Sequence, residues 1–205
     1  MSTKEKNLFQ ALDLFSKYGY SDVTMKNVAD KVGIKAPSIY KHFKSKEEIF
    51  YTILENAIVR LDERIQNVDD YKIIKNGKIS LNLEKLAIDI FEYLLQDEYV
   101  SRVRKMISIE MYKNPEAMKF YVDKFIEKPM IKHEELINYF GLSGYGDIKV
   151  LSTIFYSPIL LAVKLHDSNP EREEELIELL KETYKKLEYV LFDKQSLKED
   201  IWNLI

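Results

Sequence analysis

The chain has 205 residues, a mass of 24.3 kDa and a formal net charge of −3. Hydrophobic residues make up 46% of it and charged residues 32%, a balance that excludes a disordered protein. The absence of cysteine excludes disulfides and thiolate metal sites. The most apolar stretch, residues 154–163, is too short and interrupted to span a bilayer, and the N-terminus lacks an apolar signal-peptide core. We therefore expect a cytoplasmic protein with no membrane partner.

The first 68 residues are predicted to form four helices. A capping box at residues 2–5 opens the first, and the second lies between a threonine N-cap, Thr24, and a glycine stop, Gly33. Pro37 suits the first turn of the third helix. The fourth is the longest: its capping signal begins at Ser45, and its apolar residues follow one stripe to about residue 68.

The rest of the chain is also predicted to be helical. The pattern lapses over residues 69–80, which indicates a connection, and helical periodicity then continues in pieces from Leu81 to the C-terminus. No stretch alternates with period two for long, so the predicted fold class is all-α. The predicted organisation is an N-terminal domain over residues 1–50, a linking helix over residues 45–68, and a helical domain over residues 69–205.

The second and third helices, joined by a tight turn at Gly33, have the layout of a helix-turn-helix. Apolar residues such as Val28, Ile39 and Phe43 are expected to hold the two helices together. The segment from Thr24 to residue 46 contains six lysines and a single acid. A local excess of cations favours phosphate binding even when the total charge is negative. We expect double-stranded DNA as the partner, with the third helix in the major groove.

Twelve residues stand in register along this segment and its flanks. They are Phe15, Gly19, Thr24, Ala29, Val32, Gly33, Ser38, Tyr40, His42, Phe43, Lys46 and Glu47. At this spacing the segment resembles the N-terminal DNA-binding domain of the TetR (tetracycline repressor) family, over about residues 5 to 55. The phrase Ser38–Glu47 is especially specific to that resemblance.

The resemblance implies individual roles. Phosphate contacts are implied for Thr24, Tyr40, His42 and Lys46. Base or backbone contacts are implied for Lys26, Lys35, Ala36, Pro37, Ser38 and Lys41, of which Lys35 and Lys41 are candidates for guanine. Arginine is absent from residues 1–59, so we expect base discrimination to depend on lysine, hydroxyl and shape readout.

Two apolar helices near the C-terminus predict a homodimer. Glu171–Phe192 carries a broad apolar stripe, and Leu151–Leu165 is apolar nearly all round. Packed as a four-helix bundle, they would bury this excess and place two recognition helices on a near-palindromic operator. The predicted interface residues are Leu161, Leu165, Leu176, Leu180, Tyr184, Leu187 and Leu191. The alternative is that both helices belong to an intramolecular core.

Aromatic and methionine residues are plentiful between Leu81 and Tyr156, which predicts a pocket for a small-molecule effector. Polar tips such as Glu110 or His133 would suit an apolar or cationic ligand. The predicted lining is Phe91, Met106, Glu110, Met111, Phe120, Tyr121, Phe125, Phe155 and Tyr156. The alternative is that these side chains form ordinary core.

These features together predict a dimeric DNA-binding transcriptional regulator, a repressor released from its operator when the ligand tilts the helix over residues 45–68. The alternative is a DNA-binding regulator with no small-molecule inducer, controlled by a protein partner or constitutive. An enzyme is not expected, because three histidines and no cysteine leave little for nucleophilic chemistry. The chain also has neither a Gly-rich phosphate loop nor an HExxH-type metal pair. No catalytic residue, metal or cofactor is predicted.

Overall fold

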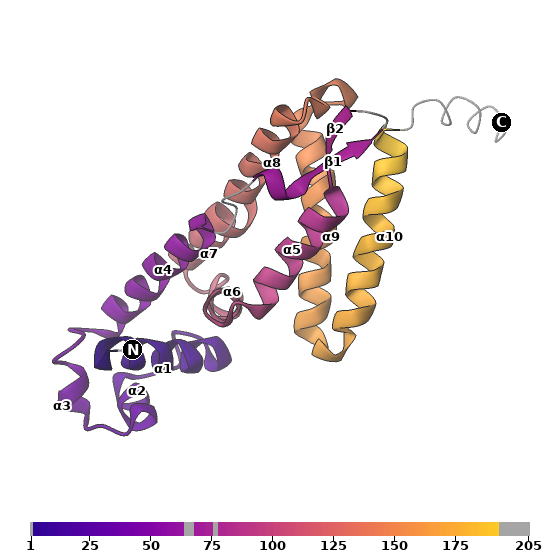
Figure 1. Cartoon of the computed structure of the whole chain (residues 1–205). Helices are drawn as coiled ribbons and strands as arrows, with labels where there is room; N and C mark the ends of the chain where they lie inside the picture. The colour runs from indigo at the N-terminus through magenta and orange to yellow at the C-terminus, as the bar shows by residue number, and fades with distance from the viewer. Residues whose placement is uncertain (1, 64–67, 76–77, 193–205) are drawn as a thin grey trace. The chain divides into compact units, whose positions relative to one another are not determined.

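The computed structural model of the chain describes residues 2–63, 68–75 and 78–192. Almost all of its elements are helices, which confirms the all-α prediction (Figure 1). The chain divides into two compact units. Unit 1 comprises Met1–Gln66 and Gln96–Lys128, and unit 2 comprises Asn67–Leu95 and Pro129–Ile205.

Unit 1 contains the four N-terminal helices and two more from the middle of the chain. They are α1 (Thr3–Tyr18), α2 (Met25–Val32), α3 (Ala36–Ile39), α4 (Lys46–Glu63), α6 (Glu98–Glu110) and α7 (Pro115–Val122), and a π-helical turn, η2 (Asp123–Glu127), follows.

Helices α1 and α2 and the start of α4 lie where the sequence predicts, whereas α4 is described to Glu63 and Val68, near its predicted end, belongs to η1. At the start of α1 the Glu5 amide donates to Ser2 Oγ over 3.2 Å, and the reciprocal bond completes a capping box. Gly33, with φ +79°, closes α2 in the left-handed region that glycine adopts without strain. The amide of Glu48 donates to Ser45 Oγ over 3.1 Å at the start of α4.

The core of unit 1 explains why residues 96–128 belong with the N-terminal helices rather than with the rest of the C-terminal part. Helix α1 packs against α6 as well as α2 and α4. Phe15 of α1, Ile53 of α4 and Met106 of α6 are all fully buried. Residues 1–50, the expected N-terminal domain, thus share their compact unit with residues 96–128, and α6 covers an apolar face of α1.

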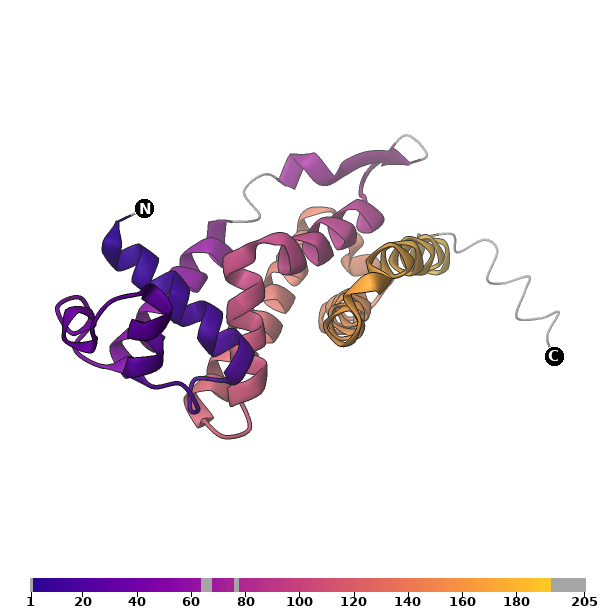
Figure 2. The ribbon, with the colours of Figure 1, turned by 90° about the horizontal axis from the view of Figure 1, so that it is seen from below.

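Unit 2 consists of a small hairpin and a set of long helices. Its elements are η1 (Val68–Tyr71), β1 (Lys72–Lys75), β2 (Lys78–Leu81), α5 (Leu83–Gln96), α8 (Lys128–Tyr139), η3 (Leu142–Tyr145), α9 (Ile148–Ser168), η4 (Pro170–Arg172) and α10 (Glu173–Phe192). Helices α9 and α10 run side by side (Figures 1 and 2).

The hairpin is a difference from the predicted connection over residues 69–80. Strands β1 and β2 are antiparallel, with Ile73 opposite Ser80 and Ile74 opposite Ile79. Four residues per strand are too few for a clear alternation of polar and apolar residues. The exposure of both Ile74 and Ile79 obscures the pattern further, so the sequence does not read as a strand pair.

Helix α9 continues through Pro158, although a proline inside a helix lacks the amide that would donate to the preceding turn, whereas α8 begins at Lys128 beside Pro129. Helix α9 is also long and apolar enough to cross a membrane by length and composition alone, a test that core helices of soluble proteins pass as well.

Two glycines at helix ends allow a matched test of this packing. Gly19 and Gly33 have φ of +85° and +79°. A methyl group on Gly19 would lie 2.6 Å from Glu110 Oε1 and 3.0 Å from Ile109 Cγ2, but on Gly33 it would meet nothing within 4 Å. We expect Gly33→Ala to lower the free energy of unfolding by about 1 kcal/mol, and Gly19→Ala by about 3 kcal/mol because a close contact adds to the backbone strain. Urea unfolding measures both. Equal losses of unfolding free energy would contradict close packing of α6 against Gly19.

Candidate nucleic-acid interface and candidate pocket

The α2–α3 segment has the geometry of a helix-turn-helix. Between the helices the Gly33 amide donates to the Asp30 carbonyl over 3.1 Å, and the Ile34 amide donates to the Ala29 carbonyl over 3.0 Å. Ile39 and Phe43 are fully buried, which fixes the short helix α3 against the rest of unit 1. The remaining side chains of α3 and its flanks are left at the surface.

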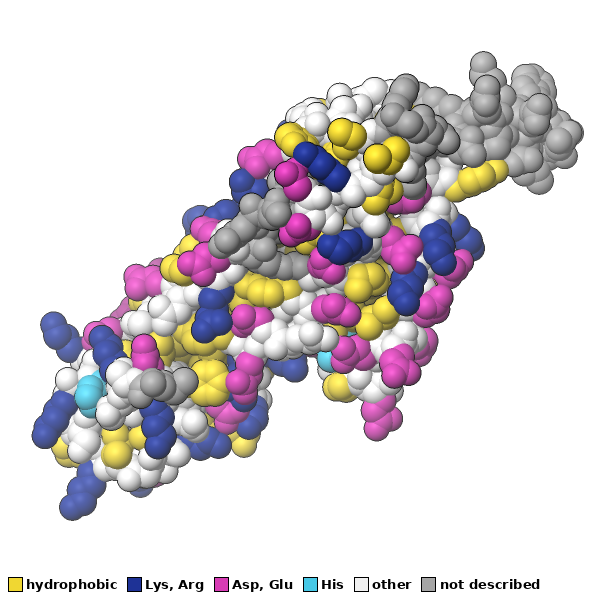
Figure 3. All heavy atoms as spheres, in the orientation of Figure 1, with side chains coloured by type: hydrophobic (Ala, Val, Ile, Leu, Met, Phe, Trp, Pro, Cys, Tyr) yellow, Lys and Arg dark blue, Asp and Glu magenta, His cyan; other side chains and the backbone are white. Residues whose placement is uncertain are grey.

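The predicted DNA-contacting residues lie on this surface with differing exposure. Tyr40 is 51% exposed. Thr24, Lys26, Lys35, Pro37 and Lys41 are exposed as well, whereas Ala36, Ser38, His42 and Lys46 are half-buried. Dark blue Lys and Arg side chains gather around the α1–α3 end of unit 1 (Figure 3).

The lysines of this segment fall into two groups. Within the described ranges, Lys26, Lys35, Lys41 and Lys44 are exposed and enter no ion pair, so their ammonium groups are available to an anion. Lys31 instead pairs with Asp13 over 3.3 Å. It therefore belongs to the scaffold rather than to the free cationic surface.

Asp13 is the centre of a charge cluster that joins three helices. Besides Lys31 of α2, its carboxylate contacts Lys17 of α1 at 3.0 Å and Arg102 of α6 at 3.6 Å. Burial works to raise the pKa of Asp13, but hydrogen bonds from Lys17 and Lys31 outweigh it, and the pKa lies below its usual value. The carboxylate is thus held ionised between α1, α2 and α6.

Thr24 has a structural task at the start of α2. Its Oγ1 accepts from the Asn27 amide over 3.2 Å and donates to Asn27 Oδ1 over 2.6 Å. The exposed hydroxyl caps the helix, and this role is compatible with the predicted phosphate contact.

Lys46 is engaged inside unit 1. Its Nζ donates to the Tyr20 carbonyl over 2.7 Å and to the Ser21 carbonyl over 3.3 Å, and it lies 4.3 Å from the centroid of the Tyr20 ring. Partial burial lowers the pKa of the ammonium below its ordinary value, although the carboxylates of Glu110 and Asp22 oppose this. Sequence reasoning missed these partners, because a backbone carbonyl carries no residue signal.

The predicted pocket residues are divided between the two units. Met106, Glu110, Met111, Phe120, Tyr121 and Phe125 belong to unit 1, and Phe91, Phe155 and Tyr156 belong to unit 2. Glu110, predicted as a polar tip for a ligand, is instead bound by the amide and hydroxyl of Ser21.

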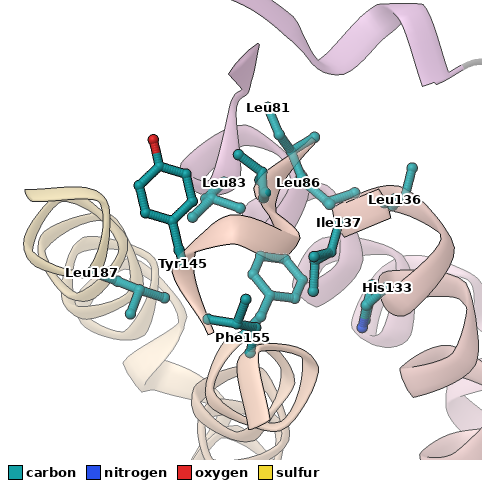
Figure 4. A pocket seen from close by; sticks show the side chains of 11 residues that line it. Leu81, Leu83, Leu86, His133, Leu136, Ile137, Tyr145, Phe155 and Leu187 are labelled. Atoms are coloured by element: carbon teal, nitrogen blue, oxygen red, sulfur yellow. The ribbon is translucent and has the colours of Figure 1, made fainter. Parts of the chain in front are cut away.

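A small apolar cavity lies within unit 2 (Figure 4). Its volume is about 30 Å³. It is lined by Leu81, Leu83, Leu86, His133, Leu136, Ile137, Leu142, Tyr145, Leu151, Phe155 and Leu187. Phe155 is the member of the predicted lining that it includes, and His133 packs against the Phe155 ring with centroids 4.7 Å apart. Sequence reasoning emphasised aromatic and methionine residues, whereas most of the lining is leucine, which sequence alone does not distinguish from ordinary core.

The predicted dimer stripe is largely occupied within the subunit. Leu176, Leu180 and Tyr184 of α10 are buried in unit 2, which is the intramolecular alternative, and Leu187 lines the cavity. Leu165 is half-buried, Leu161 is 59% exposed, and the side chain of Leu191 lies outside the described residues. Another set of apolar side chains on the two helices is exposed instead: Val150, Ile154, Leu179, Tyr189 and Val190.

A helix-turn-helix with a free cationic surface, carried on a helical body, defines a DNA-binding protein of the helix-turn-helix class. Residues 8–52 match the family model for bacterial regulatory proteins of the tetR family. The chain is 26% identical over 141 residues to the biofilm operon icaADBC HTH-type negative transcriptional regulator IcaR of Staphylococcus epidermidis, covering 67% of this chain and 69% of that protein.

A second relative is the uncharacterized HTH-type transcriptional regulator YdgC of Bacillus subtilis, 25% identical over 145 residues, which cover 68% of this chain and 69% of YdgC. The solved structure of the MbdR regulator from Azoarcus sp. CIB has the same fold, with a TM-score of 0.65, 20% identity, and coverage of 93% of this chain and 98% of that one. Residues 8–52 therefore carry the DNA-binding domain of the TetR family, and the chain is a DNA-binding transcriptional regulator rather than an enzyme.

Proposed function

We propose that the protein is a homodimeric repressor that binds a near-palindromic double-stranded DNA operator through α2, α3 and their flanks. The observation that carries the proposal is the group of exposed lysines without ion pairs, Lys26, Lys35 and Lys41, on a helix-turn-helix. Repression is supported by the 26% identity to IcaR, which is named as a negative regulator.

Within this proposal the contacts divide by chemistry. Lys35 and Lys41 donate to guanine, since both are exposed beside α3, and Thr24, Tyr40 and His42 contact phosphate. Lys26, Ala36, Pro37 and Ser38 meet bases or backbone. Lys46 contacts phosphate only if its ammonium leaves the carbonyls of Tyr20 and Ser21.

The salt dependence of binding tests the lysine surface. In a fluorescence anisotropy titration with a duplex selected on the wild-type protein from a randomised pool, Lys26→Ala should lower the slope of log affinity against log salt by about 1, because one phosphate contact is lost. Lys149→Ala, which removes an exposed lysine of α9, is the matched control and should leave the slope unchanged. Equal slopes for both variants would remove Lys26 from the phosphate contacts.

The dimer is proposed to form through exposed apolar side chains of α9 and α10. Val150, Ile154 and Leu161 recur on α9 at spacings of four and seven residues, which places them on one helical face, and Leu179 and Val190 share a face of α10. Exposed apolar stripes on two adjacent helices are the surface that a four-helix bundle between two subunits would bury.

A charge placed on this stripe should separate the subunits. Leu161→Glu would put a carboxylate into an apolar interface, and we expect it to give monomers in sedimentation velocity and to weaken operator binding. Ile131→Glu, on α8 and 54% exposed, makes the same change at a matched exposure and should leave the oligomeric state unchanged. A dimer that persists in Leu161→Glu would move the interface elsewhere.

A small-molecule effector is proposed to bind at the unit 2 cavity after that cavity widens. Its volume of about 30 Å³ holds one or two water molecules, whereas pockets for drug-sized ligands enclose roughly 300–1,000 Å³. Because the lining comes from β2, α5, α8, η3, α9 and α10, a ligand would have to separate these elements. A ligand that binds only the opened state shifts the population towards it. The same small volume favours the second candidate, a regulator that has no small-molecule inducer.

An apolar dye distinguishes the two candidates. If the cavity opens, anilinonaphthalenesulfonate should bind the folded protein saturably and lower the affinity of the protein for the selected duplex. Leu142→Phe, which fills the cavity from η3, should reduce dye affinity several-fold, whereas Ile131→Phe at an exposed site of α8 should not. The absence of saturable binding to wild-type protein would favour the regulator without an inducer.

A further inference from the structure

Glu110, the last residue of α6, holds the turn between α1 and α2. Its side chain is 0% exposed. The Ser21 amide donates to Oε1 over 2.9 Å, and the Ser21 hydroxyl donates to Oε2 over 2.8 Å. Two bonds from one residue fix both the position and the orientation of Ser21 relative to α6.

The last turn of α6 sits directly against the end of α1. Gly19 caps α1, and its amide donates to the Phe15 carbonyl over 2.9 Å. The space where a Cβ of Gly19 would stand is closed by Glu110 Oε1, at 2.6 Å. The carboxylate can therefore reach Ser21 because the residue that ends α1 has no side chain.

The same turn receives the first residue of α4. Lys46 Nζ donates to the carbonyls of Tyr20 and Ser21, so α4 and α6 both bind the turn that leads into α2. Thr24, the N-cap of α2, is three residues beyond Ser21. The placement of the helix-turn-helix on α4 and α6 is thus determined at this turn.

Helix α6 holds the α1–α2 pair at a second point as well. Arg102, two helical turns before Glu110, lies 3.6 Å from Asp13 of α1, and Asp13 also pairs with Lys31 of α2. The contacts of Arg102 and Glu110 are two helical turns apart. Together they oppose rotation of α6 relative to α1 and α2 about either contact.

A buried glutamate at position 110 is electrostatically unfavourable compared with an apolar side chain. It stands at the C-terminal end of α6 and beside the C-terminal end of α1, where both helix dipoles are negative. Burial of a carboxylate adds a desolvation cost that an apolar side chain of the same volume would avoid. What the carboxylate supplies instead is a defined geometry between α6 and Ser21.

We propose that Glu110 is a positioning residue for operator binding, which acts through Ser21 to set α2 and α3 at the angle that a specific duplex requires. The inference rests on the proposed function of the protein as a DNA-binding repressor. It assigns to Glu110 no contact with DNA and none with an effector.

Two substitutions at Glu110 separate hydrogen bonding from charge. Glu110→Met keeps the volume but loses both acceptors. Glu110→Gln also removes the charge, but its amide oxygen accepts from the Ser21 amide and its NH₂ donates to the Ser21 hydroxyl oxygen. We expect Glu110→Met to weaken binding to a duplex selected on the wild-type protein about tenfold, and Glu110→Gln to retain most of the affinity. Binding to a random-sequence duplex of the same length should not weaken in either variant, because removal of a negative charge does not reduce attraction to phosphate.

Ser21→Ala tests the same link from the other side and leaves the core of unit 1 intact. It should weaken binding to the selected duplex, and in combination with Glu110→Met it should add nothing to the loss. Glu55→Gln, an exposed acid of α4, is the control for loss of a carboxylate. Urea unfolding shows which variants fold, and if Glu110→Met does not, Ser21→Ala carries the test.

Equal affinities of folded Glu110→Met and Glu110→Gln, or unchanged binding by Ser21→Ala, would overturn the positioning role. If the wild-type protein selected no preferred duplex from the pool, the proposed function itself would fail, and that result is distinct from either of these.

Discussion

The helix-turn-helix depends on a turn that is held from two sides. Residues 19–24 join α1 to α2, and they are bound by the carboxylate of Glu110 from α6 and by the ammonium of Lys46 from α4. The two groups bind different atoms of the turn. Glu110 accepts from the amide and hydroxyl of Ser21, whereas Lys46 donates to the carbonyls of Tyr20 and Ser21. The buried acid and the half-buried base each have hydrogen-bond partners of their own at this turn. The surface offered to DNA is thus a consequence of contacts made behind it.

This arrangement divides the basic residues of the motif by function. Lys31 and Lys46 are bound to oxygen atoms of unit 1, whereas Lys26, Lys35, Lys41 and Lys44 are exposed without an ion pair among the described residues. A cation already bound to the protein contributes less to binding DNA, since it must give up one partner to gain another. The net charge of −3 is therefore a poor guide to DNA binding, and the count of six lysines overstates the cations that are free.

Local signals allowed much of unit 1 to be predicted from sequence. The cap at Thr24, the glycine stop at Gly33 and the buried Ile39 and Phe43 depend on residues within a few positions of one another. The hydrogen bonds between Ser21 and Glu110 join residues 89 positions apart, and no spacing rule connects an acid with a serine at that separation. The pocket lining and the dimer stripe could not be predicted for a similar reason. A periodic apolar pattern tells which residues share a helical face, but not whether a neighbouring helix of the same chain already covers them.

The cavity of unit 2 limits how the proposed effector could act. With about 30 Å³ of space, its leucine-rich wall is close to native packing, so binding of a larger molecule must displace whole helices rather than fill a vacancy. Packed interiors respond to such insertion by moving elements as units. Helix α5, which contributes Leu83 and Leu86 to the wall, continues in the chain directly into α6, which ends at Glu110. A ligand that moves α5 therefore has a covalent route to the residue that holds the α1–α2 turn, and the coupling would be expressed as a change in operator affinity without any change in the DNA-contacting side chains.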